Sequence, residues 1–162
     1  MITFENYDRK IEKINKVLVA YGIASLEDAE KLCKEKGIEP KCHCLNYDAW
    51  LPNWLNNATI EEHKAKLEKR FCEIAEHYAK DLPSFEVTNE TLQNCRSKFF
   101  YEDDFLEWSY RMADRYFPNN RLIINDYNIW WPNSYNNRNA YFMQIERLLR
   151  NGITHLDSIG MQ

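Results

Sequence analysis

Apolar residues recur at helical spacing in several separate stretches of the chain. The clearest stretch begins with Thr59 and Glu62, which are spaced as a capping box, and its apolar stripe continues to about Lys80. Ser25 and Asp28 resemble a second capping box, and Gly37 is typical of the end of the helix that follows. The spacing predicts further helices at 8–19, 26–36, 105–116 and 139–150.

Short runs of β-branched and aromatic residues lie between these helical stretches. They predict strands at 41–47, 85–88, 122–125 and 156–160. Alternation of strands and helices is typical of a parallel sheet, and the long spacing between strands suits βαβ units with long loops. The predicted fold class is therefore α/β, a partial (β/α)8 TIM barrel of about four βα units with parallel strands.

Polar and aromatic side chains gather directly after the predicted strands. In a (β/α)8 barrel the ligand site lies at the carboxyl ends of the strands, so we expect these side chains to share a site. They are Asn46, Tyr47, Asp48 and Trp50 after the first strand, Asn89 and Glu90 after the second, Asn125, Asp126, Tyr127, Asn128, Trp130 and Trp131 after the third, and Gln162 after the fourth.

A glutamate beside an amide and several flat aromatic rings suits the chemistry of sugars. The carboxyl group can protonate a glycosidic oxygen, the amide can bind a hydroxyl, and the rings can pack against sugar faces. In the alternative interpretation Glu90 only caps the turn that follows it, and the aromatic residues pack in the core. Two candidate platforms for sugars, Trp130 and Trp131, lie in the predicted loop after the third strand.

Composition narrows the classes of partner. A chain of 162 residues that is 44% hydrophobic and 14% aromatic suits one globular domain with a substantial core. The net charge of −4, with acids and bases interspersed, offers no basic surface for nucleic acid or anionic lipid. No stretch approaches the ~20 apolar residues of a membrane span, so we expect a neutral or small polar ligand and no nucleic-acid or membrane partner. Without a recognisable signal peptide, the chain as written is expected in the cytoplasm.

The cysteines predict neither disulfides nor a metal site. Five is an odd number, and their scatter is typical of free thiols in a reducing compartment. Cys42 and Cys44 would lie on one face of a strand and His43 on the other, so they would not converge on an ion. We expect no metal and no cofactor, and we expect His63 to be solvated on a charged helix.

Four motifs stand in order at the predicted strand ends. They are HCLNYDAWLPNW (43–54), VTNE (87–90), LIINDYN (122–128) and LDSIGMQ (156–162). Together they resemble the family 10 glycoside hydrolases, the endo-β-1,4-xylanases, from Lys41 to the end of the chain, with a weaker likeness before it. The resemblance implies a single partial catalytic domain over 1–162, with N-terminal helices in 1–40 and central barrel strands and helices in 41–162. It also implies that the substrate is xylan or a xylo-oligosaccharide, which relatives commonly meet outside the cell.

The resemblance also implies roles for individual residues. Glu90 would be the general acid/base of a retaining mechanism, and Asn89 would hold the sugar 2-hydroxyl next to the cleaved bond. Asp48 stands where the family has a second histidine that helps to bind the sugar, and it would add negative charge near Glu90. The other matched positions would line or support the cleft: His43, Trp54, Asn125, Asp126, Tyr127 and Gln162.

A retaining glycosidase also needs a second carboxylate about 5 Å from the first. In the family this nucleophile lies on the strand after the motif that ends at Gln162, so we expect it to be missing and the isolated chain to be weakly active or inactive. Glu86 is not expected to replace it: it shares a face with Glu90 but would lie ~13 Å further down the strand. Asp48 and Asp126 are not expected to replace it either, because the family gives neither of them a nucleophilic role.

Two alternatives to a hydrolase fragment remain open. One is a carbohydrate-binding remnant without catalysis, and the other is a structural protein or a decayed gene product. A partial barrel would leave the edges of its first and last strands unpaired. The chain is therefore expected to form a homodimer or to pair with a complementing half of a barrel.

Overall fold

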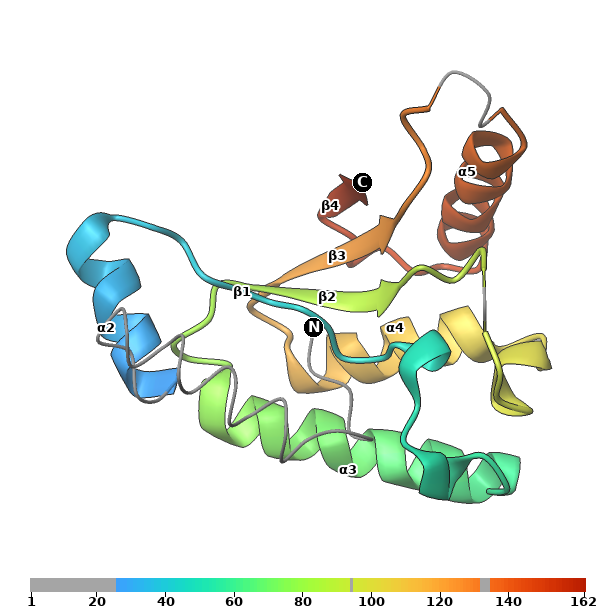
Figure 1. Ribbon diagram of the computed structural model, residues 1–162, viewed down its shortest axis with the longest axis horizontal. Coiled ribbons are helices and arrows are strands. Elements are labelled where there is room, and N and C mark those ends of the chain that lie inside the picture. The colour runs from blue at the N-terminus through green and yellow to red at the C-terminus, as the bar shows by residue number, and fades with distance from the viewer. Residues whose placement is uncertain (1–25, 94, 132–134) are drawn as a thin grey trace.

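The computed structural model describes residues 26–93, 95–131 and 135–162 (Figure 1). The predicted helix at 8–19 lies outside these residues. In chain order the helices and strands are α2 (Leu26–Lys36), β1 (Lys41–Cys42), α3 (Ile60–Tyr78), β2 (Ser84–Asn89), α4 (Phe105–Tyr116), β3 (Arg121–Asp126), α5 (Tyr135–Arg150) and β4 (Ser158–Met161). Three short 3-10 turns accompany them: η2 (Asp48–Trp50), η3 (Asn53–Leu55) and η4 (Phe99–Tyr101).

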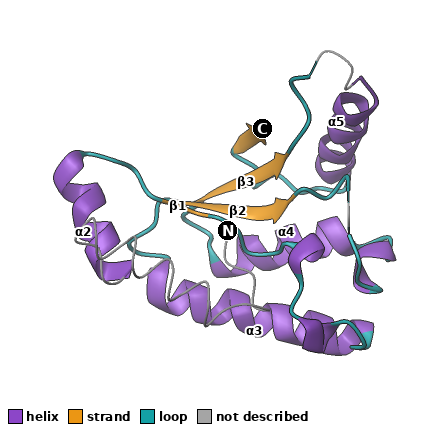
Figure 2. Ribbon diagram, in the orientation of Figure 1, coloured by secondary structure: helices purple, strands orange, loops and turns teal. Residues whose placement is uncertain are grey.

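The four strands form one sheet in the order β1-β2-β3-β4, and every neighbouring pair is parallel. Asn89 pairs in register with Asn125, and Asn125 pairs with Gly160, so the carboxyl ends of three strands meet at one edge of the sheet. Helices follow the strands in alternation, and α3 and α4 lie together on one side of the sheet (Figure 2). This arrangement confirms the predicted fold class of a partial (β/α)8 barrel.

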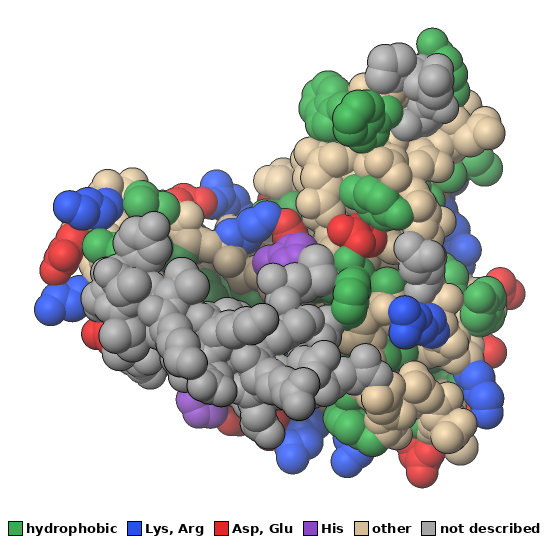
Figure 3. All heavy atoms as spheres, viewed as in Figure 1, with side chains coloured by type: hydrophobic (Ala, Val, Ile, Leu, Met, Phe, Trp, Pro, Cys, Tyr) green, Lys and Arg blue, Asp and Glu red, His purple; other side chains and the backbone are tan. Residues whose placement is uncertain are grey.

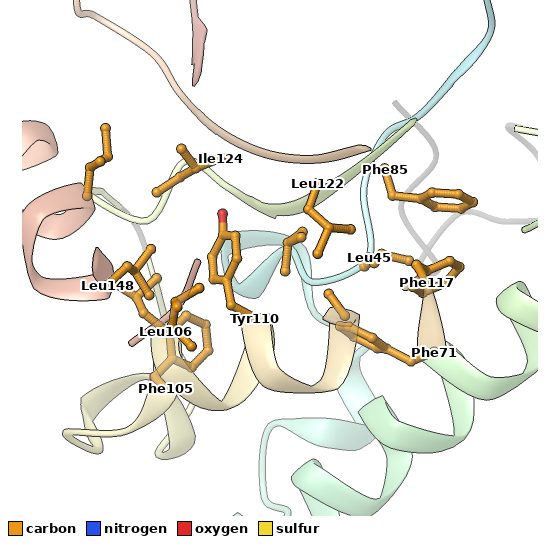
Figure 4. Close-up of a cluster of buried hydrophobic side chains, with 14 of the residues drawn as sticks. Leu45, Phe71, Phe85, Phe105, Leu106, Tyr110, Phe117, Leu122, Ile124 and Leu148 are labelled. Atoms are coloured by element: carbon orange, nitrogen blue, oxygen red, sulfur yellow. The ribbon is translucent and has the colours of Figure 1, made fainter. Parts of the chain in front are cut away.

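The hydrophobic core fills the space between the sheet and helices α3 and α4. Figure 4 shows Leu45, Phe85 and Leu122 on the sheet side and Phe71, Tyr110 and Phe117 on the helices. The rings of Phe85 and Phe117 pack with centroids 4.2 Å apart. Burying each large apolar side chain contributes roughly 1.5–3 kcal/mol, and this packing holds the strand ends in place.

The ends of two helices follow the sequence signals. The Thr59 hydroxyl accepts a hydrogen bond from the backbone N–H of Glu62 at 3.2 Å, and the Glu62 carboxylate accepts one from the Thr59 N–H at 2.8 Å. This reciprocal pair confirms the predicted capping box of α3. Helix α2 ends before Gly37, whose φ of +65° lies in the left-handed region that favours glycine.

Two predicted boundaries are wrong by several residues. The first strand was expected over 41–47, but β1 ends at Cys42. Beyond it the chain still follows β2, since the N–H groups of Leu45 and Asn46 donate to the carbonyls of Glu86 and Val87 at 2.8 and 2.9 Å. Helix α5 begins at Tyr135, four residues before the predicted start, although its asparagine-rich first turn has low helix propensity.

The prediction of a solvated His63 is also wrong, since its side chain is only 2% exposed. His63 precedes Leu67 and Phe71 at four-residue intervals and so extends the buried stripe of α3, where its ring packs edge-on against Phe99 at 5.6 Å. Burial lowers the pKa of His63, although the nearby Asp48 opposes the shift. The stripe could have been extended to this position from the sequence.

All five cysteines carry free thiols, and only Cys44 is fully buried. Across the described ranges, no three metal-ligating side chains come together as an ion site would require. No described helix is both long and apolar enough to cross a membrane.

Candidate active site

Glu90 follows the last residue of β2 and has a φ of +54°, in the left-handed region that non-glycine residues rarely adopt. Its N–H donates to the carbonyl of Asn125 on β3 at 3.0 Å, which fixes the backbone between the two strand ends. Unusual backbone of this kind costs of order 1–3 kcal/mol and is concentrated at functional sites. The geometry therefore sets Glu90 apart from an ordinary capping residue.

Two hydrogen-bond donors hold the Glu90 carboxylate. The Tyr47 hydroxyl donates to Oε2, and the Gln162 side-chain amide donates to Oε1 at 2.9 Å. Burial and the adjacent Glu90 carboxylate raise the pKa of Tyr47, so the phenol keeps its proton and remains a donor. Sequence reasoning placed Tyr47 near the strand ends but assigned it no role, because its contact with Glu90 joins two separate motifs.

An irregularity in β2 turns Asn89 towards the next strand. The register against β3 shifts between Glu86 and Thr88. Val87 belongs to the core, and the adjacent Thr88 hydroxyl lies 3.4 Å from the Tyr110 hydroxyl of α4, so two successive residues face the helices. The simple alternation that would place Glu86 and Glu90 on one face is therefore interrupted.

Asn89 and Asn125 form a buried amide pair. The Asn125 amide nitrogen donates to the side-chain oxygen of Asn89 at 2.7 Å. Asn89 has no exposed surface, and its own amide nitrogen has no hydrogen-bond partner in the described part of the chain. Buried polar groups are usually paired, so this free donor is notable at a strand end.

Gly160 on β4 makes room for this pair. A Cβ atom at Gly160 would lie 2.3 Å from the Asn125 side-chain oxygen, a distance at which something must shift. The glycine stands in the fourth motif, yet its role could not be read from the sequence because it depends on the register of two strands.

The end of β4 is tied to the loop after β3. The Gln162 N–H donates to the Asp126 carbonyl at 3.0 Å, and the Ile129 N–H donates to the Gln162 carbonyl at 3.3 Å. These two bonds place the Gln162 side chain beside Glu90. The neighbouring Tyr127 is partly buried, and its hydroxyl donates to the side chain of Gln93.

Asp126 joins the same loop to the segment after Glu90. Its carboxylate accepts from the backbone N–H of Tyr127 at 2.8 Å and from that of Leu92 at 3.1 Å. Burial raises the pKa of Asp126 to about 6, against the opposing effect of these N–H donors. Asp126 therefore holds the loop after β3 against the segment that follows Glu90, and its role in a cleft stays a prediction.

His43 and Lys41 hold a second, buried carboxylate below the strand ends. Both side chains form hydrogen bonds with Glu86, which is 1% exposed. Burial alone would raise the pKa of Glu86, but the hydrogen bonds and charges of His43 and Lys41 outweigh it and hold the pKa below its usual range. The His43 ring is partly open and lies edge-on to Tyr47 at 6.2 Å, so it reaches the site next to the Glu90 donor.

Asp48, which stands where the family motif has a histidine, is buried. It is 1% exposed, and it accepts hydrogen bonds from the backbone N–H groups of Arg96 and Ser97 at 2.6 and 3.0 Å and from the Ser97 hydroxyl. The side chain therefore anchors the loop after β2. Trp54, by contrast, is 63% exposed on η3 and makes no hydrogen bond with the Glu90 group in the described residues.

The site thus combines a carboxylate held by a phenol and an amide with a buried amide pair beside it. Acidic, histidine and hydrophobic side chains meet over the sheet near the middle of the face in Figure 3. Such a group can transfer a proton and bind hydroxyl groups of a ligand. The described residues present no cluster that would hold a metal ion.

Comparisons of sequence and structure agree on one family. The sequence pattern of glycosyl hydrolase family 10 matches residues 1–162. Endo-1,4-beta-xylanase 5 of Pyricularia oryzae is 30% identical over 170 residues, which cover 100% of this chain and 41% of that protein. Endo-1,4-beta-xylanase B of Neocallimastix patriciarum is 25% identical over 172 residues, which cover 100% of this chain and 20% of that protein.

Solved structures show the same fold. The family 10 enzyme from Paenibacillus barcinonensis superposes with a TM-score of 0.72 at 23% identity, over 85% of this chain and 46% of that one. A psychrophilic family 10 endo-β-1,4-xylanase superposes with a TM-score of 0.72 at 21% identity, over 85% and 48% of the two chains. The chain thus spans less than half the length of these relatives.

Proposed function

Because the chain belongs to glycosyl hydrolase family 10, we propose that it forms part of an enzyme that hydrolyses the β-1,4-xylosidic bonds of xylan. The observation that carries this proposal is the Glu90 carboxylate, held between the Tyr47 hydroxyl and the Gln162 amide at the carboxyl end of β2. The two xylanase relatives, similar over the full length of the chain, support the choice of substrate.

In the proposed mechanism Glu90 protonates the glycosidic oxygen as the bond breaks and later removes a proton from the attacking water. The two donors to Glu90 stabilise its charged form after the proton has left. The family motif assigns Asn89 to a substrate hydroxyl next to the cleaved bond, and its unpartnered but fully buried amide nitrogen must turn towards the cleft to donate to that hydroxyl. His43, Asn125 and Gln162 orient these two groups.

The second carboxylate of a retaining mechanism lies about 5 Å from the acid/base. Among the carboxylates at the strand ends, Asp48 and Asp126 are buried and already accept backbone N–H groups. We therefore assign the nucleophile to a part of the barrel that this sequence does not include. The coverage of less than half of each relative is consistent with that assignment.

A second candidate function is binding of xylan without hydrolysis. The observation that favours it is the buried Asp48, which anchors the loop after β2 where the family motif has a sugar-binding histidine. Under this alternative the amide pair and the tryptophans at the strand ends bind the polysaccharide, and Glu90 does not act on the glycosidic bond.

The test is release of reducing ends from β-1,4-xylan by a complete barrel, in which a family 10 relative supplies the strands that carry the nucleophile, and by the Glu90→Gln variant of this parent. The proposal predicts hydrolysis by the parent and a loss of roughly 10²–10⁴-fold in the variant, with xylan binding retained. Glu102→Gln, which neutralises an exposed carboxylate on another part of the surface, is the matched control and should hydrolyse normally. Binding by the parent without any release of reducing ends would favour the second candidate, and full activity of Glu90→Gln would reject the role of Glu90.

A further inference from the structure

Asn151 and Gly152 form an Asn-Gly pair directly after α5, and it is the only such pair in the sequence. Both residues are exposed, and they lie in the turn that leads from α5 to the buried Ile153. Gly152 has a φ of +77°, and a Cβ atom at this position would meet nothing within 4 Å. The turn therefore has open space around the peptide bond that joins the two residues.

An Asn-Gly pair undergoes a reaction that other asparagines undergo much more slowly. The backbone nitrogen of the glycine attacks the side-chain carbonyl carbon of the asparagine, the C–NH2 bond breaks, and ammonia leaves with the proton of the attacking nitrogen. Water then opens the resulting cyclic imide at either of its carbonyls, which gives aspartate or isoaspartate. The net change is the exchange of NH2 for OH, without oxidation or reduction. Glycine favours the attack because it has no side chain to crowd the nitrogen and because its backbone is permissive.

The hydrogen bonds that hold this turn are those of a helix end. The Gly152 N–H donates to the Leu149 carbonyl at 3.1 Å, and the Asn151 N–H donates to the Arg147 carbonyl at 3.0 Å. Helix ends fray, so bonds of this kind open locally while the core stays folded. The Gly152 nitrogen can then reach the side chain of Asn151, and solvent supplies the water.

The side chain of Asn151 ties the end of α5 to α4 (Figure 1). Its amide nitrogen donates to Oε1 of Glu107 at 2.7 Å, and Nε of Arg147 donates to the same oxygen at 2.7 Å. Glu107 is only 8% exposed, so its carboxylate depends on these donors more than on water. Conversion of Asn151 to aspartate would replace a donor with a second carboxylate beside Glu107, and like charges in a poorly solvated place repel each other.

We propose that Asn151 is a hydrolytic modification site, at which slow deamidation with water as the co-reactant weakens the contact between α4 and α5. The inference is independent of the proposed function, because it needs only solvent and the residues of this turn. Arg147 still pairs with Glu107 in the product, so the contact is weakened and not abolished. Isoaspartate also lengthens the main chain directly before the turn into the core at Ile153.

The first test is peptide mapping by mass spectrometry after the folded protein has stood in mildly alkaline buffer, which favours the attacking form of the backbone nitrogen. The peptide that contains Asn151 should gain the mass of the exchange of NH2 for OH and become a substrate for an isoaspartate-specific methyltransferase. Asn57, which is exposed in a turn and precedes Ala58, is the matched internal control and should stay unconverted. Asn151→Gln should abolish the change. Equal conversion at both asparagines, or conversion only in the urea-unfolded chain, would overturn the inference.

The second test measures the consequence for the α4–α5 contact by thermal unfolding. Asn151→Asp, which carries the product side chain, should lower the unfolding temperature by about 5 °C, the shift expected when a chain of this size loses a hydrogen bond to a charged group. Asn151→Ala removes the donor without adding charge and should fall between this variant and the parent. In a Glu107→Gln background Asn151→Asp should have a much smaller effect, because no carboxylate faces the new one. Equal shifts in the two backgrounds, or no shift in either, would reject the coupling to Glu107.

Discussion

At the scale of single residues, Tyr47 of the first motif contacts Glu90 of the second. Its hydroxyl is one of two donors to the Glu90 carboxylate, and the other comes from Gln162 at the end of β4. A phenol can donate to the carboxylate and can also accept from the protonated acid, so it can serve both states of a group that exchanges its proton.

Tyr47→Phe removes this hydroxyl and keeps the ring. The Glu90 carboxylate then loses one of its two hydrogen bonds, a contact worth roughly 1.5–3 kcal/mol, and with it part of its orientation towards the glycosidic oxygen. In a complete barrel that includes the nucleophile, kcat for xylan hydrolysis should therefore fall by roughly tenfold or more. A rate identical to that of the parent would exclude Tyr47 from this role, and Tyr101→Phe provides the control.

The sequence motifs predicted which residues stand at the strand ends, but their contacts required the fold. Glu90 and Gln162 are brought into direct contact, while their catalytic and binding roles stay predictions. The need for a glycine at position 160 and the burial of Asp48 could not be predicted, because both depend on atoms from distant segments. The hydrophobic periodicity of the sequence identifies the buried face of a helix or strand, but it does not identify the residues that pack against that face.

At the scale of elements, Asp126 ties the end of β3 to the segment that follows β2. Its carboxylate holds the Leu92 N–H from the loop just after Glu90. Because burial raises the pKa of Asp126 to about 6, its charged form costs free energy of folding. Between about pH 6 and the usual value of 3.8 the folded chain keeps a proton that the unfolded chain has lost.

The free energy of unfolding should therefore rise as the pH falls from 7 towards 5 through the titration of Asp126. Glu86 acts in the opposite sense: its pKa is held below the usual value of 4.5, so the stability that it contributes is lost as the pH falls further. Urea unfolding at a series of pH values should show this rise in the parent, and Asp126→Asn should flatten it. An equal rise in the variant would contradict the assignment to Asp126.

Element boundaries were predictable where local signals decide them. The capping box of α3 and the glycine after α2 are local, and both predictions are confirmed. The end of β1 depends on pairing with a distant strand, and its prediction is wrong. The prediction for the start of α5 is also wrong, because helix propensity alone disfavours its first turn. The bulge in β2, which turns Asn89 towards Asn125, has no signal in the local sequence either.

At the scale of the whole molecule, four parallel strands bring residues from four motifs to one edge of the sheet. The described sheet ends in β1 on one side and β4 on the other (Figure 1). Ile159 and Met161 on β4 are 47% and 43% exposed, and Phe142 and Met143 on α5 are 59% and 68% exposed. These surfaces lie on the side where a larger barrel would continue, in keeping with the partial coverage of the family 10 relatives.

The central claim is that Glu90 donates the proton to the departing sugar oxygen. The most direct test uses a complete barrel, in which a family 10 relative supplies the strands that carry the nucleophile, and compares it with its Glu90→Ala variant on xylan and on an aryl xylobioside whose leaving group departs without protonation. We expect a loss of roughly 10²–10⁴-fold on xylan and rapid release of the aryl group in a pre-steady-state burst, because only the first substrate needs the acid. Equal losses of bond cleavage on both substrates, or no loss on xylan, would contradict it.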